Sequence, residues 1–201
     1  MLTLLTPFRY LTLQHRSKVL YDVVLPVAGS AILTALLVAL PKPVTIIGEK
    51  GYLAQLQTLL TILAGFFIAA LTMITTDKSG LLAQPVGGLE PPRLPGHKEP
   101  LSRRRFLAYL FGYLSSASIV LVVFAVLGNL VGVQISQLLR GDFHAIAKIV
   151  FLVVFNFWLC HLGIATLLGL FYFTERLQIG DPEFRVRKPG VAPSRDKLER
   201  L

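Results

Sequence analysis

Charge is scarce in this chain, and cysteine is almost absent. Asp, Glu, Lys and Arg make up 15% of the 201 residues, against about a quarter in soluble domains. Hydrophobic residues make up 54% and gather in uninterrupted runs, a pattern typical of membrane spans. The single cysteine, Cys160, excludes an intrachain disulfide. The composition therefore predicts an integral membrane protein with one transmembrane domain and no separate soluble domain.

Catalytic and metal-binding patterns are missing as well. The sequence contains no GxSxG motif, no Walker loop and no His/Glu spacing of a metal site. All eleven acidic residues lie at the ends of the apolar runs or outside them. This leaves His161, inside the last run, as the one ionisable side chain predicted at membrane depth. We therefore expect no enzymatic activity, no metal and no cofactor.

Four apolar runs predict an all-α fold with four transmembrane helices arranged as two hairpins. The first hairpin covers residues 23–76 and the second covers residues 106–174. A 1–22 segment precedes them, and we expect it either to lie at the membrane interface as an amphipathic segment or to lead directly into the first span. A Pro-rich basic loop (77–105) separates the hairpins, and a basic tail (175–201) follows them. Because the linker between the first two spans is short, these spans are expected to be antiparallel neighbours.

The distribution of basic residues predicts the orientation. The N-terminal segment, the central loop and the tail together hold 16 Lys and Arg residues, whereas the two short linkers hold four. Cytoplasmic loops carry an excess of Lys and Arg, so both termini and the central loop are expected in the cytoplasm. The expected location is the bacterial inner (plasma) membrane.

The central loop is the largest polar segment between the spans. It contains five prolines, which cannot continue a helix or enter a central strand. Its basic residues predict either an anchor to anionic lipids of the cytoplasmic leaflet or a docking surface for an acidic cytoplasmic effector protein. We do not expect direct nucleic-acid binding, because the net charge of +9 fits basic loops facing lipid. The candidate partner-binding or lipid-binding residues are Arg93, Lys98, Arg103, Arg104, Arg105, Arg185, Arg187 and Lys188.

Small and polar residues within the spans predict helix packing and a homo-oligomer. The pairs Gly65/Ala69 and Gly128/Gly132 have the spacing that lets another helix approach closely. Asn156 is expected to hydrogen-bond a neighbouring helix, with a conduction role as the alternative. His161 is expected to be neutral and hydrogen-bonded, with a titrating or gating role as the alternative. The full set of packing candidates is Gly65, Ala69, Gly128, Gly132, Asn156, His161 and Gly163.

Two short stretches carry a family resemblance, GFFIAAL at 65–71 and RFLAYLFGYLS at 105–115. Together with the four-span plan, they resemble KwaA, the membrane subunit of bacterial Kiwa antiphage defence systems. The resemblance implies a homotetramer that senses phage attack at the inner membrane. It also implies a cytoplasmic partner, the DNA-binding subunit KwaB. No catalytic residue of the family is carried over to this chain.

Two other functional classes remain open. The chain could be a small pore-forming effector or ion channel, or a structural subunit of a membrane complex. A channel needs a continuous path lined by polar or small residues, whereas most span positions here are Leu, Val, Ile or Phe. A cytoplasmic partner would distinguish the sensor or adaptor class from both alternatives.

Overall fold

The computed structural model describes residues 3–13, 18–41, 44–78, 80–86, 101–138 and 142–176. Over these ranges the chain is helical and contains no strand, which confirms the all-α prediction. The four long helices are α1 (Leu25–Ala39), α2 (Tyr52–Thr76), α3 (Arg103–Leu138) and α4 (Asp142–Phe171). Four short helical segments accompany them: η1 (Thr3–Thr12), η2 (Leu20–Val24), η3 (Leu81–Ala83) and η4 (Tyr172–Arg176). η2 runs directly into α1, and η4 directly follows α4.

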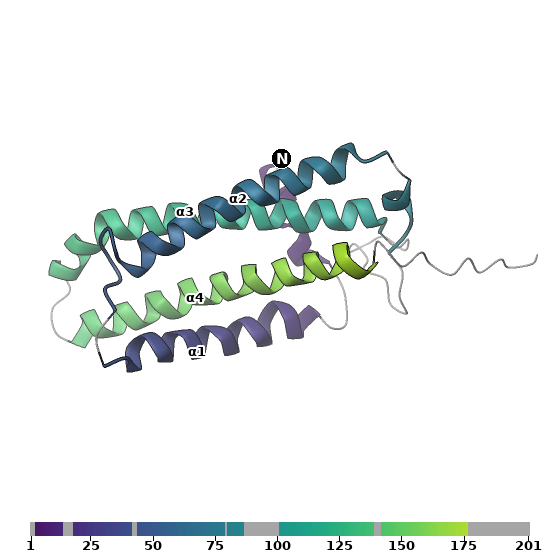
Figure 1. Cartoon of the computed structure of the whole chain (residues 1–201). Helices are drawn as coiled ribbons and strands as arrows, with labels where there is room; N and C mark the ends of the chain where they lie inside the picture. Colours follow the sequence, from purple (N-terminus) through teal and green to yellow (C-terminus); the bar gives the residue numbers. More distant parts are fainter. Residues whose placement is uncertain are drawn as a thin grey trace, which may run out of the picture.

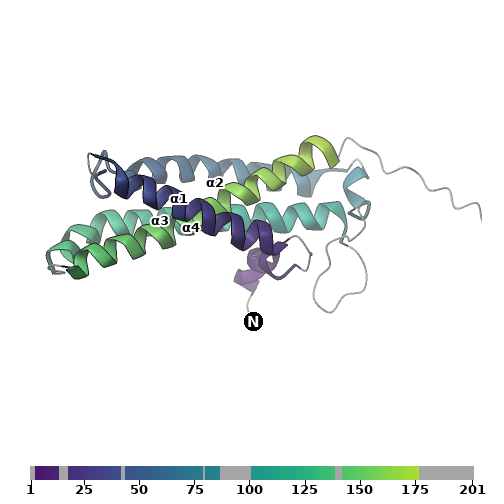
Figure 2. The same ribbon diagram turned by 90° about the horizontal axis from the view of Figure 1, so that it is seen from below.

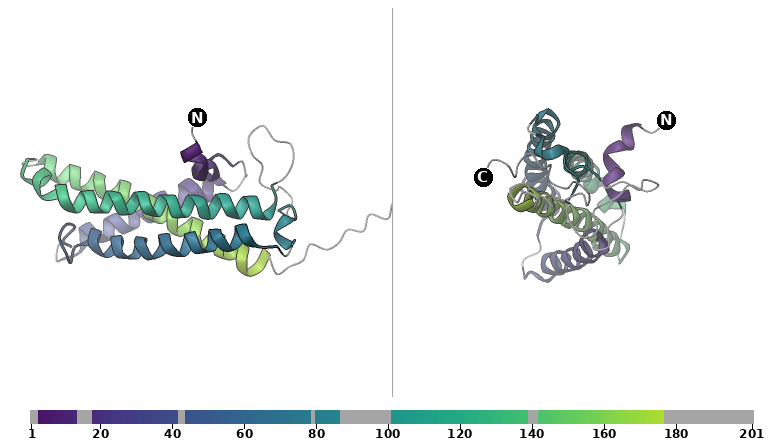
Figure 3. Two further views of the ribbon diagram at one scale, coloured as in Figure 1. Left: turned by 90° about the horizontal axis from the view of Figure 1, so that it is seen from above. Right: turned by 90° about the vertical axis from the view of Figure 1, so that its right-hand side faces the viewer.

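The long helices pair in an order that differs from their order in the chain. The most extensive contacts join α2 to α3 and α1 to α4, and a smaller contact joins α3 to α4. α1 and α2 are consecutive but lie on opposite sides of the bundle (Figures 1 and 3). The linker between them therefore crosses the end of the bundle. The predicted packing of the first two spans as neighbours is not seen.

Each of the four helices is long and apolar enough to cross a membrane. The candidate spans are Leu20–Ala39, Tyr52–Thr76, Arg103–Ile135 and Ala145–Thr174. At 1.5 Å per residue the first is about 30 Å long, close to the hydrocarbon thickness of a bilayer, whereas the third is about 50 Å long. The helices around α1 therefore extend past it. The sequence sets the ends of α1, with Pro26 in its first turn and an extended Leu40 just before Pro41.

α1 buries small and polar residues and exposes its large apolar ones. Its buried residues are Pro26, Ser30 and Thr34, which follow one another at a spacing of four on one helix face. Ile32 and Leu36 are more than half exposed. A surface helix of a soluble protein has the opposite pattern. This arrangement fits a helix surrounded by hydrocarbon, where small and polar groups face the neighbouring helix.

The loop-side halves of α2 and α3 form the main apolar core. Phe67 of α2 packs against Phe111 of α3, and Phe111 also contacts Phe173 of η4. Farther along α3 most large apolar side chains are exposed, among them Ile119, Phe124 and Ile135, whereas Leu121 and Ala125 stay buried. The most extensively buried part of α3 therefore lies toward the central loop.

The N-terminal segment lies against α3 (Figure 2). Tyr10 and Leu13 are buried there, whereas Arg9 and Leu11 are exposed. Phe8 contacts the ring of Tyr113 edge-on. The segment is therefore amphipathic, and it is a packed part of the bundle.

Candidate functional site

Five titratable side chains meet where the N-terminal segment reaches the long helices. We call them the titratable cluster. Lys18 lies in the helical turn before η2 and Asp22 lies within η2. Tyr10 belongs to η1, Tyr113 to α3 and His161 to α4. Four segments that are distant in the sequence therefore contribute to one site.

Asp22 is at the centre of the cluster. Its Oδ2 lies 3.4 Å from the Lys18 ammonium, and its Oδ1 lies 3.7 Å from Nε2 of His161. The Tyr10 hydroxyl donates a 3.5 Å hydrogen bond to the same Oδ1. The Asp22 side chain is only 13% exposed. A carboxylate buried to this extent requires such partners, because desolvation otherwise disfavours the charged form.

His161 is held on two sides. The Tyr113 hydroxyl lies 2.9 Å from its Nδ1, and its other ring nitrogen faces Asp22. A hydroxyl donating to Nδ1 leaves the proton on Nε2, directed toward the carboxylate. The imidazole also packs edge-on against the Trp158 ring, with centroids 5.9 Å apart. The predicted hydrogen bond from His161 to another helix is present, and it is accompanied by a charged neighbour that was not predicted.

Lys18 fastens η1 to the start of the first span. Its Nζ donates to the backbone carbonyls of Tyr10 and Leu11, at 2.8 and 2.5 Å. Burial lowers the pKa of Lys18, and the charge of Asp22 opposes this change. Burial, followed by the charge of Asp22, raises the pKa of Tyr10. Both groups are therefore held in a desolvated site whose stability depends on their protonation.

A second polar site joins three helices nearer the 44–50 linker. The Asn156 amide nitrogen donates to Thr34 Oγ1 at 3.0 Å, and the Tyr52 hydroxyl donates to Asn156 Oδ1 at 2.6 Å. Asn156 is fully buried and thus links α1, α2 and α4. Close by, Ser30 Oγ donates to the Val153 carbonyl at 2.8 Å. The interhelical role expected of Asn156 agrees with this geometry.

The three consecutive arginines have three different environments. Arg103 is buried at 6% exposure, Arg104 approaches the Asp77 carboxylate at 3.8 Å, and Arg105 is exposed. Arg104 also donates to the Asp77 carbonyl. A docking surface at this position would therefore present Arg105 more fully than its two neighbours.

The described ends of the central loop are paired with each other. The Val86 amide donates to the Leu101 carbonyl at 2.9 Å, and the Arg103 amide donates to the Gln84 carbonyl at 2.8 Å. Val86 and Leu101 are buried in the core. Both ends of the loop are thus part of the folded bundle. The other basic candidates lie outside the described residues: Arg93, Lys98, Arg185, Arg187 and Lys188.

The predicted small residues divide into two groups. A Cβ added at Gly128 would lie 3.0 Å from Leu53 Cδ1, and one added at Gly132 would lie 2.5 Å from Ile47 Cδ1. Both glycines therefore pack within one chain. Gly65 and Gly163 would meet nothing within 4 Å, and Ala69 is exposed. These last three residues are available to lipid or to another chain.

Several contacts in the bundle lie outside the sequence-based predictions. A Cβ at Gly29 would lie 3.0 Å from Cys160 Sγ, so this glycine permits the close approach of α1 to α4. The sequence pattern places Asp22 in the polar segment before the first span, but the structure places it in the titratable cluster. Two signals could have identified it. Lys18 and Asp22 have the i,i+4 spacing of an ion pair, and Asp22, Pro26, Ser30 and Thr34 are four residues apart on one face.

The class of protein follows from this architecture: four apolar helices with buried polar contacts between them form a multi-pass membrane protein. Within the described ranges, no group of three or more His, Cys, Asp or Glu side chains could hold a metal ion. No family model, curated protein or solved structure matches the chain.

Proposed function

We propose that the chain is a non-catalytic sensor and adaptor subunit of a bacterial antiphage defence complex. In this proposal it forms a homo-oligomer in the inner membrane and docks a cytoplasmic DNA-binding effector protein. Both termini and the central loop face the cytoplasm, because that side carries 16 of the 20 Lys and Arg residues. The assignment to antiphage defence rests on the resemblance of residues 65–71 and 105–115 to the Kiwa membrane subunit.

The observation that carries the sensor proposal is the titratable cluster. It attaches η1 to α3 and α4 through an ion pair, a histidine and two tyrosines. Such contacts depend on protonation and on the relative positions of the helices, so a disturbance of the membrane changes how firmly η1 is held. Ionisable residues at membrane depth commonly mark functional sites. A releasable N-terminal segment on the cytoplasmic side supplies the two states that a sensor requires.

The adaptor part of the proposal rests on the central loop. The described segments on either side of residues 87–100, Gln84–Val86 and Leu101–Arg103, pair with each other. Residues 87–100 carry Arg93 and Lys98 together with four prolines. Proline-rich segments lose less conformational entropy on binding than flexible ones. We therefore place effector docking on residues 87–100, together with Arg105.

Affinity isolation from a phage-challenged host tests the adaptor proposal. The wild-type chain should recover a cytoplasmic DNA-binding protein and lower phage plating efficiency. Replacing residues 87–100 by a Gly/Ser linker of equal length should abolish both effects while membrane insertion is unchanged. The matched control deletes residues 190–201 and keeps the loop. If the loop variant recovers the same partner, residues 87–100 do not form the docking site and only connect the two halves of the chain.

An ion or proton channel is the second candidate, and the Asp22–His161 pair favours it. Carboxylates and histidines in membrane spans line proton pathways in pumps and transporters. Purified protein in liposomes should then dissipate a proton gradient, and His161→Phe should remove that activity. Conduction by the wild type, without any cytoplasmic partner in the isolation experiment, would replace the sensor proposal with the channel.

A further inference from the structure

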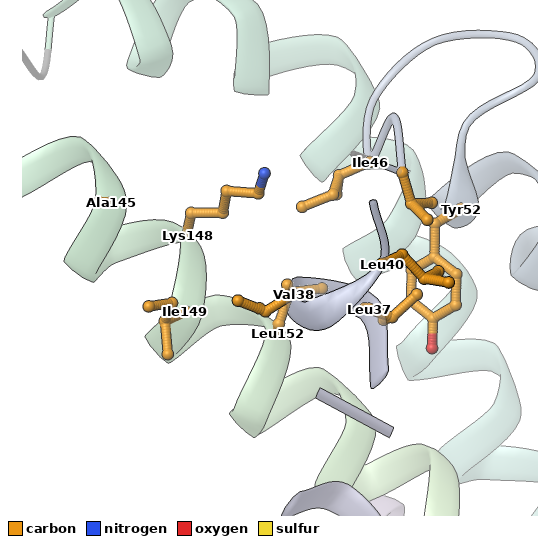
Figure 4. A pocket seen from close by; sticks show the side chains of 10 residues that line it. Leu37, Val38, Leu40, Ile46, Tyr52, Ala145, Lys148, Ile149 and Leu152 are labelled. Carbon is orange, nitrogen blue, oxygen red and sulfur yellow. The ribbon is translucent and has the colours of Figure 1, made fainter. Parts of the chain in front are cut away.

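A hollow of about 230 Å³ lies at the end of the bundle nearest the 44–50 linker (Figure 4). The last turns of α1 contribute Leu37 and Val38 to its wall, and the linker contributes Ile46. α4 supplies Leu152 from a position deeper in the bundle. The wall is therefore mostly aliphatic, and it is built by α1, the linker, α4 and, through Tyr52, α2.

One charged group faces this aliphatic wall. Lys148 extends from α4 toward Ile46 (Figure 4). Among the described side chains, no carboxylate lies within ion-pair distance of its ammonium group. A lysine near the end of a span usually directs its amine toward water and lipid head groups while its methylenes cover apolar surface. Here the cation is placed beside a hollow that an alkyl chain can fill.

We propose that the hollow binds one acyl chain of an anionic phospholipid, with the lipid phosphate on Lys148. The hollow is smaller than the roughly 300–1,000 Å³ of pockets that enclose a whole small ligand. It therefore holds part of a larger molecule, and a two-chain lipid can leave its second chain in the bilayer. The charge of Lys148 favours a lipid with net negative charge over a zwitterionic one. The lipid belongs to the leaflet on the side of the 44–50 linker.

A lipid bound in the hollow would affect the interhelical hydrogen bonds. Tyr52 lines the hollow, and its hydroxyl donates to Asn156, which in turn donates to Thr34. A bound chain therefore contacts a residue of the link between α1, α2 and α4. The expected consequence is a more stable bundle when the lipid is bound, because a ligand that binds only the folded state stabilises it. This inference is independent of the proposed sensor function.

Native mass spectrometry of the purified full-length chain tests the site. The protein would be titrated with phosphatidylglycerol, phosphatidylcholine or oleate. We expect one phosphatidylglycerol to be retained per chain, in preference to the other two. Lys148→Gln should weaken that binding about fivefold, the effect of one basic residue near a lipid surface. Lys50→Gln is the matched control, since Lys50 lies on the same linker side, is exposed and does not line the hollow.

A second pair of variants tests the apolar part of the site. Ala145→Phe places a ring at the wall and should displace the acyl chain, whereas Ile146→Phe, at an exposed neighbour outside the wall, should not. Helical circular dichroism would establish that each variant is folded. Equal losses in Lys148→Gln and Lys50→Gln, or no preference for phosphatidylglycerol over phosphatidylcholine, would overturn the proposal. Preferential binding of oleate would overturn it in favour of a free fatty acid.

Discussion

The carboxylate of Asp22 lies 3.7 Å from Nε2 of His161, although Asp22 is at the beginning of its span and His161 is near the middle of its own. The two residues meet because the first span is shorter than the helices around it and begins beside the middle of α4. Tyr113, which contacts His161, likewise lies away from the end of its helix: it is about 15 Å along α3 from Arg103, the first residue. A residue's depth in the bundle is thus set by the neighbouring helices as well as by its position along its own.

Asp22→Asn should loosen the N-terminal segment. The change leaves the ammonium of Lys18, which is 16% exposed, without its carboxylate partner. Lys18 keeps its hydrogen bonds to the Tyr10 and Leu11 carbonyls, but its charge loses its counter-ion in a largely buried site, at a cost of about 1–3 kcal/mol. Hydrogen exchange of the amides of residues 3–13 should accelerate, whereas exchange in α2 should change little.

The double variant Asp22→Asn with Lys18→Gln is the control for this prediction. It removes both charges together, so the part of the loss that comes from an uncompensated charge should return. The part that comes from the bonds of Lys18 to the Tyr10 and Leu11 carbonyls should not return. Unchanged exchange of residues 3–13 in Asp22→Asn alone would show that the ion pair does not hold the segment.

Ionisation of Tyr10 at high pH should release η1 from the bundle. Its pKa is raised in the docked state, mainly by burial, so docking is fully supported below the ordinary tyrosine pKa near 10 and is lost as the pH rises above it. Each further pH unit should weaken docking about tenfold in the wild type relative to Tyr10→Phe. Hydrogen exchange of residues 3–13 between pH 8 and pH 11, corrected for the intrinsic rate, measures this difference. Parallel profiles would mean that Tyr10 ionises without leaving its site.

The sequence predicted the helices well and their partners poorly. Apolar runs and prolines located all four spans, because span length and helix ends are local properties. The pairing of the helices depends on the fit between their surfaces. The sequence of one apolar run does not contain the surface of its partner helix. The polar contacts show the same division. Asn156 could be recognised as a bonding residue from its apolar surroundings, whereas its partners Tyr52 and Thr34 became visible only in three dimensions.

Asn156→Leu should destabilise the bundle by about 1 kcal/mol, a typical contribution of an interhelical hydrogen bond in a membrane. The substitution leaves the hydroxyls of Thr34 and Tyr52 without their shared partner. The midpoint of thermal unfolding in detergent should fall. Asn129→Leu provides the comparison, because Asn129 accepts a single bond from the exposed Gly48 amide and should cost less. An equal loss in the two variants would argue against a special role for Asn156.

The orientation of the chain can be tested with single cysteines in a Cys160→Ala background. Glu90→Cys lies in the central loop and Glu49→Cys lies in the exposed linker between the first two spans. Because the basic residues are concentrated on the loop side, an impermeant maleimide added to intact cells should label position 49 and spare position 90. Both should react after lysis. Labelling of position 90 in intact cells would reverse the topology and with it the cytoplasmic location of the docking segment.

Larger side chains at Gly29 and at Gly65 should affect different properties: the stability of the single chain at Gly29 and the assembly of copies at Gly65. Gly29 faces Cys160 across the α1–α4 contact, so Gly29→Val overpacks that contact and should lower the stability of the isolated chain by about 1–3 kcal/mol.

Gly65 meets nothing within 4 Å, so Gly65→Leu should leave the stability of a single chain unchanged. If α2 joins copies of the chain through Gly65 and Ala69, Gly65→Leu should instead reduce the oligomer mass measured by light scattering in detergent. An unchanged mass, together with normal expression, would remove this face of α2 from the interface and leave it exposed to lipid.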